Sequence, residues 1–296
     1  MINKEKIAEI INHKIHLFKC PICYSPMNIF DQKSIVCLKN HTFDIAKKGY
    51  VNMLNQSINS RYSKELFMAR HKMIVEKQFF ERLHQKVSEM IMKEMNAVNE
   101  EIIVLDAGCG EGSHLQIIVN KSSQLVCRGI GLDIAKEGIR KAASHYKESI
   151  WLVGDIAKLP LANQSCHVIL NILSPANYKE FKRILVPGGL VIKVVPRLNY
   201  LKELREVLIA HPDKKSYKND KIVSLFEQHF DLVDIIHIQD TKEVSQEWIN
   251  DLLHMTPLAW NYRPHSLEQI KNKRISQVSI DLDVLVGKVL TKGERE

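Results

Sequence analysis

The chain has 296 residues, of which 45% are hydrophobic and 26% are charged, a composition that is typical of folded proteins and excludes a long disordered chain. No apolar run approaches the roughly 20 residues of a membrane-spanning helix, and the charged N-terminus lacks the apolar segment of a secretory signal. We therefore expect a cytoplasmic protein without a membrane partner. The formal net charge is +8, and residues 1–75 contribute 12 basic but 5 acidic side chains, which favours contact of this part with a polyanion.

The first 60 residues differ from the rest of the chain in their pattern of apolar and turn-forming residues. Residues 1–16 place several isoleucines on roughly one helical face, which predicts a short amphipathic helix, and a poorly ordered terminus is the alternative. Residues 17–55 are rich in turn-forming residues and hold three of the six cysteines. This segment is too short to bury a sufficient core by itself.

A metal site is predicted from one spacing in this segment. Cys20, Cys23, Cys37 and His41 form the pattern C-x2-C-x13-C-x3-H, which is the arrangement of a structural zinc site built on a hairpin. Four ligands fill the tetrahedral shell, so we expect one structural zinc ion and no open position for catalysis. The alternative is three thiols that fall near a histidine by chance.

Beyond residue 60 the pattern becomes helical and then alternates. Residues 61–98 have apolar positions at spacings of three and four without glycine or proline, which predicts a helix. From residue 101 the alternation of strands and helices predicts a parallel sheet covered on both faces, and residues 277–290 fit an antiparallel edge strand. The expected strands lie at 101–106, 127–134, 149–155, 166–173, 190–196, 231–239 and 277–290, and the expected helices at 113–121, 136–147 and 175–185.

A nucleotide-binding turn is predicted after the first of these strands. Three glycines, Gly108, Gly110 and Gly112, separate that strand from a helix. Three acids, Asp106, Asp133 and Asp155, end successive strands and are expected to meet at one crevice. Glu111 lies inside the turn, where it would repel a pyrophosphate and attract a cation.

These acids favour S-adenosylmethionine, which carries a sulfonium and an ammonium group, over a dinucleotide. A glycine turn without any ligand is the alternative. We therefore predict an α/β fold of the class I, Rossmann-like, seven-stranded methyltransferase type, with a small N-terminal zinc module. The expected parts are a zinc-binding module over 1–60, a helical linker over 61–98 and a methyltransferase domain over 99–296.

Several segments also resemble a known family. The motifs CPIC, HTFDIAKKGYVNML, MARHKM, LDAGCGEG, GLDIAK, LVPGGLVIKVVP and MTPLAW occur in the order found in bacterial large-subunit ribosomal RNA guanine-N1 methyltransferases. This resemblance implies that the four predicted ligands bind zinc and that Gly110, Glu111 and the neighbouring turn contact the cofactor. It also places Phe79 and Tyr200 beside the cofactor, and it implies a homodimer. Lys77 stands where the family usually has a glycine.

The reaction that the resemblance implies is transfer of a methyl group to N1 of a guanine in ribosomal RNA. N1 lies on the Watson–Crick edge, so the base must be unpaired before it reacts. Asn171 and Ser174, in the NILSP segment after the fourth strand, are weak candidates for the catalytic residues, and turn or capping roles are the alternative.

Contact with ribosomal RNA is expected from basic side chains on and after the zinc hairpin. The candidates are Lys47, Lys48, Arg61, Arg70 and Lys72. Two other functions would fit the same sequence. One is a methyltransferase for a small molecule in which the zinc module acts as a lid, and the other is an inactive RNA-binding zinc protein.

Overall fold

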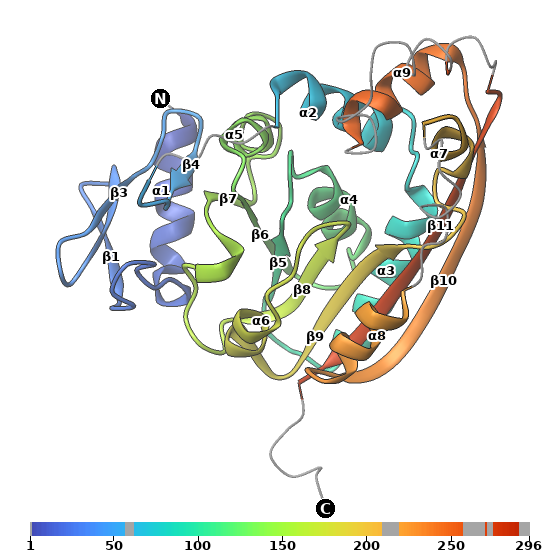
Figure 1. Ribbon diagram of the computed structural model, residues 1–296. Coiled ribbons are helices and arrows are strands. Elements are labelled where there is room, and N and C mark those ends of the chain that lie inside the picture. The colour runs from blue at the N-terminus through green and yellow to red at the C-terminus, as the bar shows by residue number, and fades with distance from the viewer. Residues whose placement is uncertain (1, 57–61, 209–218, 257–269, 271–274, 290–296) are drawn as a thin grey trace, which may run out of the picture.

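The computed structural model describes residues 2–56, 62–208, 219–256, 270 and 275–289 (Figure 1). The candidate RNA contact Arg61 and residues 257–260 of the MTPLAW motif lie outside the described residues. Within the described part of the chain, no helix combines the length and the hydropathy that crossing a bilayer requires.

One twisted eight-stranded sheet forms the centre of the molecule, in the order β10-β11-β9-β8-β5-β6-β7-β4 (Figure 1). Strands β4 to β9 run parallel to one another, and β11 runs antiparallel to both β9 and β10. The parallel strands end on one edge of the sheet, where ligands bind in open α/β folds. The strands are β4 (Tyr50–Asn52), β5 (Ile102–Ala107), β6 (Cys127–Asp133), β7 (Ile150–Val153), β8 (Cys166–Ile172), β9 (Leu185–Pro196), β10 (Asp231–Glu243) and β11 (Gln277–Lys288).

Helices cover both faces of this sheet, as predicted. Alternate residues of β5 point to opposite faces: Val104 joins one hydrophobic cluster and Leu105 joins the other. One face packs against α3 (Glu81–Met95), α4 (Ser113–Lys121), α5 (Lys136–His145), α7 (Lys202–Leu208) and α9 (Gln246–Met255), and the other against α1 (Ile2–His13), α6 (Tyr178–Ile184) and α8 (Asp220–Glu227). The alternation of strands and helices in the sequence therefore predicts the layers correctly.

The predicted position of the last strand is wrong. We expected residues 277–290 to form an antiparallel edge strand, and β11 is antiparallel but lies between β9 and β10. β11 is buried along most of its length, whereas β10 follows the outer edge of the molecule and is largely exposed or half-buried (Figure 1). β10 takes the edge position because most of its side chains are exposed or half-buried, whereas most of those of β11 are buried.

The N-terminal module contributes a strand to the central sheet. Its own antiparallel sheet contains β1 (Met27–Phe30), β2 (Ser34–Cys37) and β3 (Thr42–Asp44). The next strand, β4, instead pairs in parallel with β7, and Tyr50 lies opposite Trp151. The central sheet therefore has one strand more than the seven that we expected, and the expected boundary after residue 60 separates segments that share a sheet.

The helix predicted for residues 61–98 is interrupted. The chain forms α2 (Lys64–His71), one turn of π-helix over Lys72–Glu76, and then a break in which Gln78 adopts a φ of +50° before α3 begins. The sequence contains neither glycine nor proline here, so the pattern gave no sign of the break. The interruption matters for the site because it brings Phe80 to the wall of the cavity described below.

A pair of histidines is buried between α3 and α4. The Nε2 atom of His84 lies 2.8 Å from the Nδ1 atom of His114, and both side chains are 2% exposed. Burial lowers the pKa of His84 to about 4 and holds the pKa of His114 well below its ordinary value. The pair shares one hydrogen bond when both rings are neutral. Within the described part of the chain, no carboxylate pairs with either ring, so an added proton would be buried without a compensating charge.

This pair predicts a loss of stability in mild acid. Because the pKa values are lowered in the folded state, the unfolded chain takes up protons first as the pH falls below about 6.5, at up to about 1.4 kcal/mol per pH unit for each histidine. We expect the free energy of unfolding, measured in urea, to fall less between pH 7.5 and pH 5 in His114→Gln than in the wild type. His254→Gln, at an exposed position of α9, is the control. Equal losses in all three proteins would contradict the assignment.

Candidate active site and metal centre

A cavity of about 790 Å³ opens where the parallel strands end. It is bounded by the turns after β5, β6, β7 and β8, by the carboxyl end of β9 and by α2. Its polar lining includes Asp133, Asp155, Ser174, Lys193, Arg70 and Tyr200. The volume falls in the range of cofactor and small-molecule sites.

The predicted glycine turn forms one wall of this cavity. Gly108, Gly110 and Gly112 have φ values of +88°, +59° and +79°, a region that favours glycine. Space is also limited, because a Cβ atom on Gly112 would lie 2.3 Å from the ring of Trp151. Gly108 and Gly110 line the cavity, and Gly112 precedes the first turn of α4. The turn therefore requires glycine for conformation and for close approach.

The three strand-ending acids lie around the turn in different environments. Asp133 lines the cavity and accepts hydrogen bonds from the N–H groups of Gly110 (2.8 Å) and Ala135 (2.7 Å). Asp155 also lines the cavity and accepts the N–H of Ala157. Asp106 is 1% exposed and lies behind the cavity wall. Two of the three acids thus reach the crevice, and the third is buried behind its wall.

Negative charge exceeds positive charge in this group. Glu111 is fully buried and accepts a hydrogen bond from Nε of Arg70 at 2.7 Å. Among the described residues, no other salt bridge to Glu111, Asp106 or Asp133 is found. One oxygen of Glu111 and one of Asp106 are buried without a hydrogen-bond partner. Burial, together with Asp133 and Glu111, raises the pKa of Asp106 to about 8, although Arg70 opposes the shift. Burial also raises the pKa of Asp133.

These features fit S-adenosylmethionine. Buried carboxylate oxygens without partners are costly, and a ligand that brings positive charge would stabilise their ionised form. A sulfonium and an ammonium group supply that charge, whereas a pyrophosphate would add to the negative charge. The chemistry of the donor set therefore agrees with the cofactor that the sequence predicts.

Removing the charge of Glu111 should weaken cofactor binding. We expect Glu111→Gln to raise the Kd for S-adenosylmethionine about 10- to 100-fold, because Arg70 loses its buried partner and the site loses a negative charge. Isothermal titration calorimetry measures this change. Glu180→Gln is the matched control, since Glu180 pairs with Arg183 at the same 2.7 Å distance, and Arg183, unlike Arg70, does not line the cavity. Equal affinities of the two variants would contradict the role of Glu111.

Aromatic side chains form part of the cavity wall. Tyr200 lines the cavity, as the family resemblance implies, and burial raises its pKa. Phe79 is fully buried and is not part of the lining. Its neighbour Phe80 lines the cavity instead and packs edge-on against Phe79 with ring centroids 5.0 Å apart. Phe79 therefore lies behind Phe80, which lines the cavity. Tyr62 and Phe67 also line the cavity, on the α2 side.

The NILSP segment, which includes the last two residues of β8 and the turn after it, forms a hydrogen-bonded corner of the cavity. Asn171 is fully buried, and its Nδ2 group donates to the carbonyl oxygen of Ala107 at 2.7 Å. Ser174 lines the cavity, and its hydroxyl donates to the same carbonyl oxygen at 3.0 Å. The structure thus brings both weak catalytic candidates to the glycine turn, and only Ser174 reaches the cavity lining.

Sequence reasoning missed a third polar group in this corner. Lys193 lies in β9 and contacts Asn171 through a hydrogen bond of 2.5 Å. A lysine inside the apolar run LVIKVVP is the signal that would have revealed it, because a lone lysine is rarely buried without a reason.

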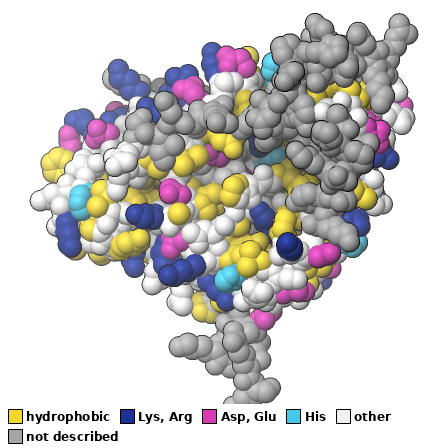
Figure 2. Space-filling model, viewed as in Figure 1, with side chains coloured by type: hydrophobic (Ala, Val, Ile, Leu, Met, Phe, Trp, Pro, Cys, Tyr) yellow, Lys and Arg dark blue, Asp and Glu magenta, His cyan; other side chains and the backbone are white. Residues whose placement is uncertain are grey.

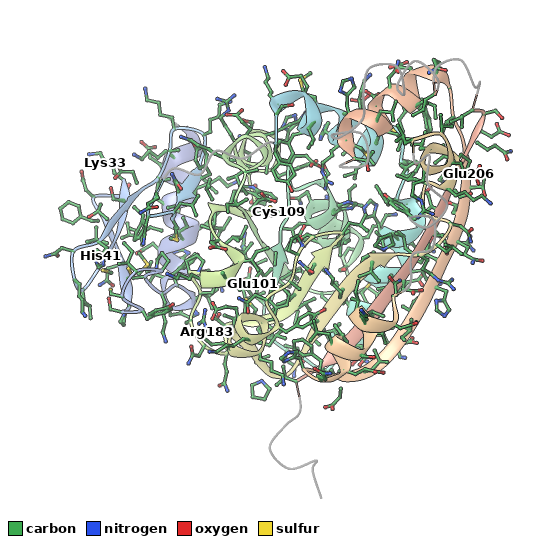
Figure 3. The ribbon with its side chains drawn as sticks, viewed as in Figure 1. Lys33, His41, Glu101, Cys109, Arg183 and Glu206 are labelled. Carbon is green, nitrogen blue, oxygen red and sulfur yellow. The ribbon has the colours of Figure 1, made fainter. Side chains whose placement is uncertain are left out.

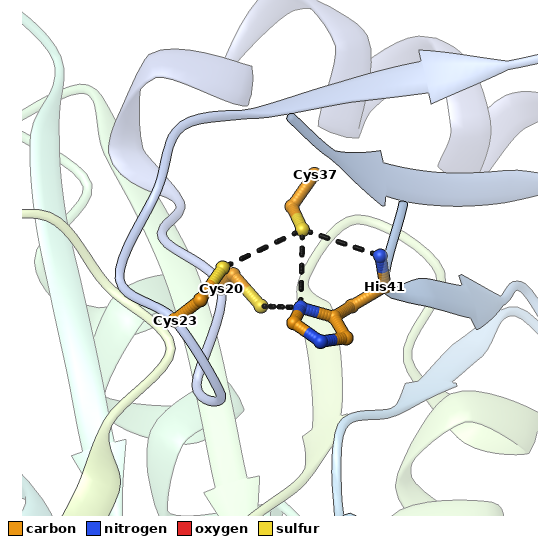
Figure 4. A group of neighbouring side chains, drawn as sticks. All are labelled: Cys20, Cys23, Cys37 and His41. Carbon is orange, nitrogen blue, oxygen red and sulfur yellow. Dashed lines mark hydrogen bonds between the residues drawn. The ribbon is translucent and has the colours of Figure 1, made fainter. Parts of the chain in front are cut away.

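The four predicted metal ligands converge in the N-terminal module (Figure 4). The Sγ atoms of Cys23 and Cys37 are 3.6 Å apart, and Nδ1 of His41 lies 3.5 Å from Sγ of Cys20 and 3.4 Å from Sγ of Cys37. Tetrahedral zinc with bonds of about 2.0 to 2.3 Å requires ligand separations of about 3.3 to 3.8 Å. Three thiols and one imidazole at these distances fit zinc, and they leave no position open for a substrate.

This cluster is separate from the cavity. Figure 3 shows His41 on the N-terminal module, far from Cys109 at the turn after β5. The other three cysteines, Cys109, Cys127 and Cys166, lie outside the cluster and are buried or half-buried. The metal centre can therefore support the fold of the module but does not contact the reacting groups.

The four candidate RNA contacts that the structure describes fall into different places. Lys47 and Lys48 are exposed in the turn between β3 and β4. Lys72 pairs with Glu247 at 2.8 Å and with Asp251 at 3.3 Å, and Arg70 belongs to the cavity. Figure 2 shows further Lys and Arg side chains on the side of the N-terminal module. Arg70 contacts buried Glu111 and lines the cavity, so it lies apart from the exposed lysines of the turn between β3 and β4.

Comparisons with known proteins agree with both sites. Residues 18–61 match the zinc-ribbon family model described as RlmA, N-terminal, and residues 104–189 match a methyltransferase-domain model. A protein of Bacillus subtilis (strain 168), named "Putative 23S rRNA (guanine-N(1)-)-methyltransferase YxjB", is 37% identical over 92% of this chain and 96% of its own length. The chain belongs to the RlmA family of 23S rRNA (guanine-N1)-methyltransferases.

Another relative of this RlmA-family methyltransferase comes from Streptomyces fradiae. It is named 23S rRNA (guanine(748)-N(1))-methyltransferase and is 26% identical over 86% of this chain and 89% of its own length. The matched zinc-ribbon region contains the four clustered ligands, and the matched methyltransferase region contains the glycine turn. The predicted fold class and family are thereby confirmed.

Proposed function

We propose that this chain transfers a methyl group from S-adenosylmethionine to N1 of a guanine in 23S ribosomal RNA. Family membership over nearly the whole chain supports the reaction. The observation that carries the proposal is the cavity at the glycine turn, where the carboxyls of Asp106, Glu111 and Asp133 lie close together and Arg70 pairs with Glu111. A site with this charge selects a cationic ligand.

The residues that would hold the cofactor follow from the geometry. Asp133 keeps lone pairs free for the ribose hydroxyls beyond the two amides that it accepts, and Asp155 borders the place of the adenine. Glu111 and Asp106 complement the positive charge. S-adenosylmethionine supplies a methyl group made electrophilic by its sulfonium. The protein contributes placement of N1 in line with that methyl group and exclusion of water.

The corner formed by Ser174, Pro175 and Lys193 is the proposed place of the guanine. N1 reacts only when the base has left its helix, and a flipped base needs a flat apolar wall on which to stack. Tyr62 and Phe67, whose ring centroids are 6.2 Å apart, supply aromatic surface on the α2 side of the same cavity.

The zinc module is proposed to hold RNA rather than to react with it. A structural zinc ion would fix the hairpin, and the exposed Lys47 and Lys48 would contact phosphates next to it. Binding by such contacts weakens with salt because it releases counterions from RNA. Ribosomal RNA as substrate also implies action in the cytoplasm, and a homodimer stays a prediction.

Mapping of ribosomal RNA tests the function. N1-methylguanine stops reverse transcriptase, so we expect a stop in 23S rRNA from cells with the gene that disappears when the gene is deleted and returns when it is restored. Purified protein should create the same stop on RNA from the deletion strain in the presence of S-adenosylmethionine. Cofactor binding without any stop would favour the small-molecule methyltransferase, and RNA binding without cofactor binding would favour the inactive zinc protein.

A further inference from the structure

A lysine is buried in the strand that borders the proposed guanine site. Lys193 is 6% exposed and stands in the middle of β9, where its neighbours Ile192 and Val194 are fully buried. It nevertheless belongs to the lining of the cavity. Burying an amine costs free energy unless its hydrogen bonds are satisfied, so its contacts indicate what holds it there.

Among the described residues, the amine donates two hydrogen bonds, and both go to neutral oxygens. Nζ donates to Oδ1 of Asn171 at 2.5 Å and to the backbone carbonyl of Ser174. Across the sheet, Lys193 lies opposite Asn171 of β8 on one side and Leu285 of β11 on the other. No salt bridge to Lys193 occurs within residues 2–56, 62–208, 219–256, 270 and 275–289. The two oxygens fix two of the three directions of the amine and leave the third for a molecule in the cavity.

The same two residues connect the amine to the cofactor turn. Asn171 and Ser174 both donate hydrogen bonds to the carbonyl oxygen of Ala107. Ser174 also packs so closely on Gly108 that a Cβ atom there would lie 2.1 Å from its hydroxyl oxygen. A single residue, either Asn171 or Ser174, therefore connects Lys193 to the turn that would hold the methyl donor. Lys193 lies on the side of the cavity that is proposed for the guanine.

We propose that Lys193 is a catalytic residue whose neutral amine accepts the proton from N1 of the guanine. This role rests on the proposed function, because N1 carries a proton that must leave before its electron pair can attack the methyl carbon. Asn171 is a positioning residue that aims the amine through its side-chain oxygen. Ser174 aims it through its backbone carbonyl.

The electrostatic surroundings favour the neutral form of the amine. Burial lowers the pKa of Lys193 to about 8, close to the operating range of a general base. The elements packed against it present Asn171, Ser174 and the apolar Leu285, none of which carries charge. The titratable groups that line the same cavity are Tyr62, Arg70, Asp133, Asp155, Arg197, Tyr200 and Arg205.

The proposed step balances in atoms and charge. The N1–H bond breaks as its proton moves to Nζ, and the electron pair left on N1 forms the bond to the methyl carbon. The bond between that carbon and sulfur breaks, and its electrons stay on sulfur. The positive charge thus moves from the sulfonium to the ammonium of Lys193, which returns its proton to water when the product leaves.

The test measures single-turnover methylation of unmodified 23S rRNA between pH 6 and pH 10. For the wild type we expect the rate to rise with pH and to level off near pH 8. For Lys193→Met we expect a rate that is about 10²- to 10⁴-fold lower at pH 7.5 and does not level off near pH 8. Affinity for S-adenosylmethionine and for RNA should change less than about threefold. Lys193→Gln repeats the test with a polar side chain in case the methionine variant does not fold.

Lys288→Met is the matched control, because Lys288 lies in the neighbouring strand and pairs with Glu94 outside the cavity lining. It should keep the wild-type rate and pH profile. A wild-type rate that is constant from pH 6 to pH 9, or a Lys193 variant with the wild-type rate, would overturn the role of Lys193 alone. A wild-type protein that leaves every guanine N1 unmethylated at all pH values would overturn the proposed function and, with it, this role.

Discussion

Replacing Gly112 with alanine is expected to abolish the binding of S-adenosylmethionine. The new Cβ atom would lie 2.3 Å from the ring of Trp151, which is fully buried and held by a hydrogen bond from its Nε1 to the carbonyl oxygen of Tyr146. Neither side can move without disturbing the turn, whose φ of +79° is also unfavourable for alanine. We expect the Kd to rise about 100-fold or more, and the free energy of unfolding to fall by about 2 to 4 kcal/mol.

Gly188→Ala separates these two causes. Gly188 has a similar φ of +74°, but nothing lies within 4 Å of the position of its Cβ atom. This variant should lose only about 1 kcal/mol of stability and bind the cofactor as the wild type does. Calorimetry and urea unfolding measure both quantities. If Gly112→Ala bound the cofactor as tightly as Gly188→Ala, the close approach of Gly112 to Trp151 would not be needed for cofactor binding.

Loss of a zinc ligand is expected to remove RNA methylation. Cys37→Ser should lower the zinc content, measured by elemental mass spectrometry, from about one ion per chain to near zero, because three ligands rarely hold a structural ion. Methyl transfer to 23S rRNA should fall about 100-fold or more as the hairpin unfolds. Because β4 joins β7, which leads to Asp155, we also expect a several-fold loss of cofactor affinity rather than none.

Cys127→Ser provides the comparison, since Cys127 is a half-buried thiol of β6 that lies outside the metal cluster. It should keep zinc, cofactor affinity and activity. A zinc-free Cys37→Ser protein that methylates RNA at the wild-type rate would refute the structural role of the ion. Point substitutions are preferable here to deletion of residues 1–60, because the deletion would also remove β4 from the central sheet.

The metal centre and the cofactor turn could be predicted from the sequence because their chemistry depends on local spacing. Four ligands in a hairpin of fixed length, and glycines between a strand and a helix, leave little choice of geometry. The buried partners of these groups could not be predicted. In the sequence, Arg70 is one more basic residue near the N-terminal module, and only the fold shows that it contacts Glu111.

The same limit explains the errors in the fold. β4 has three residues, too few to show a strand pattern, and its partner β7 is distant in the sequence. The break at Gln78 depends on packing around Phe79 and Phe80 rather than on a glycine or proline. Lys193 was not predicted as a site residue because a strand is recognised from its apolar residues. The polar contacts of Lys193 come from another strand and a loop, which the local sequence does not show.

The pairing of β4 with β7 also sets an order for folding during synthesis. Tyr50 leaves the ribosome about 100 residues before its partner Trp151, which corresponds to about 5 to 20 s of translation. The hairpin that carries the four metal ligands must keep its shape alone for that time. When β7 then emerges, residues 50–52 are already available to pair with it. The outer edge of β7 is therefore covered early and has little opportunity to pair with another chain.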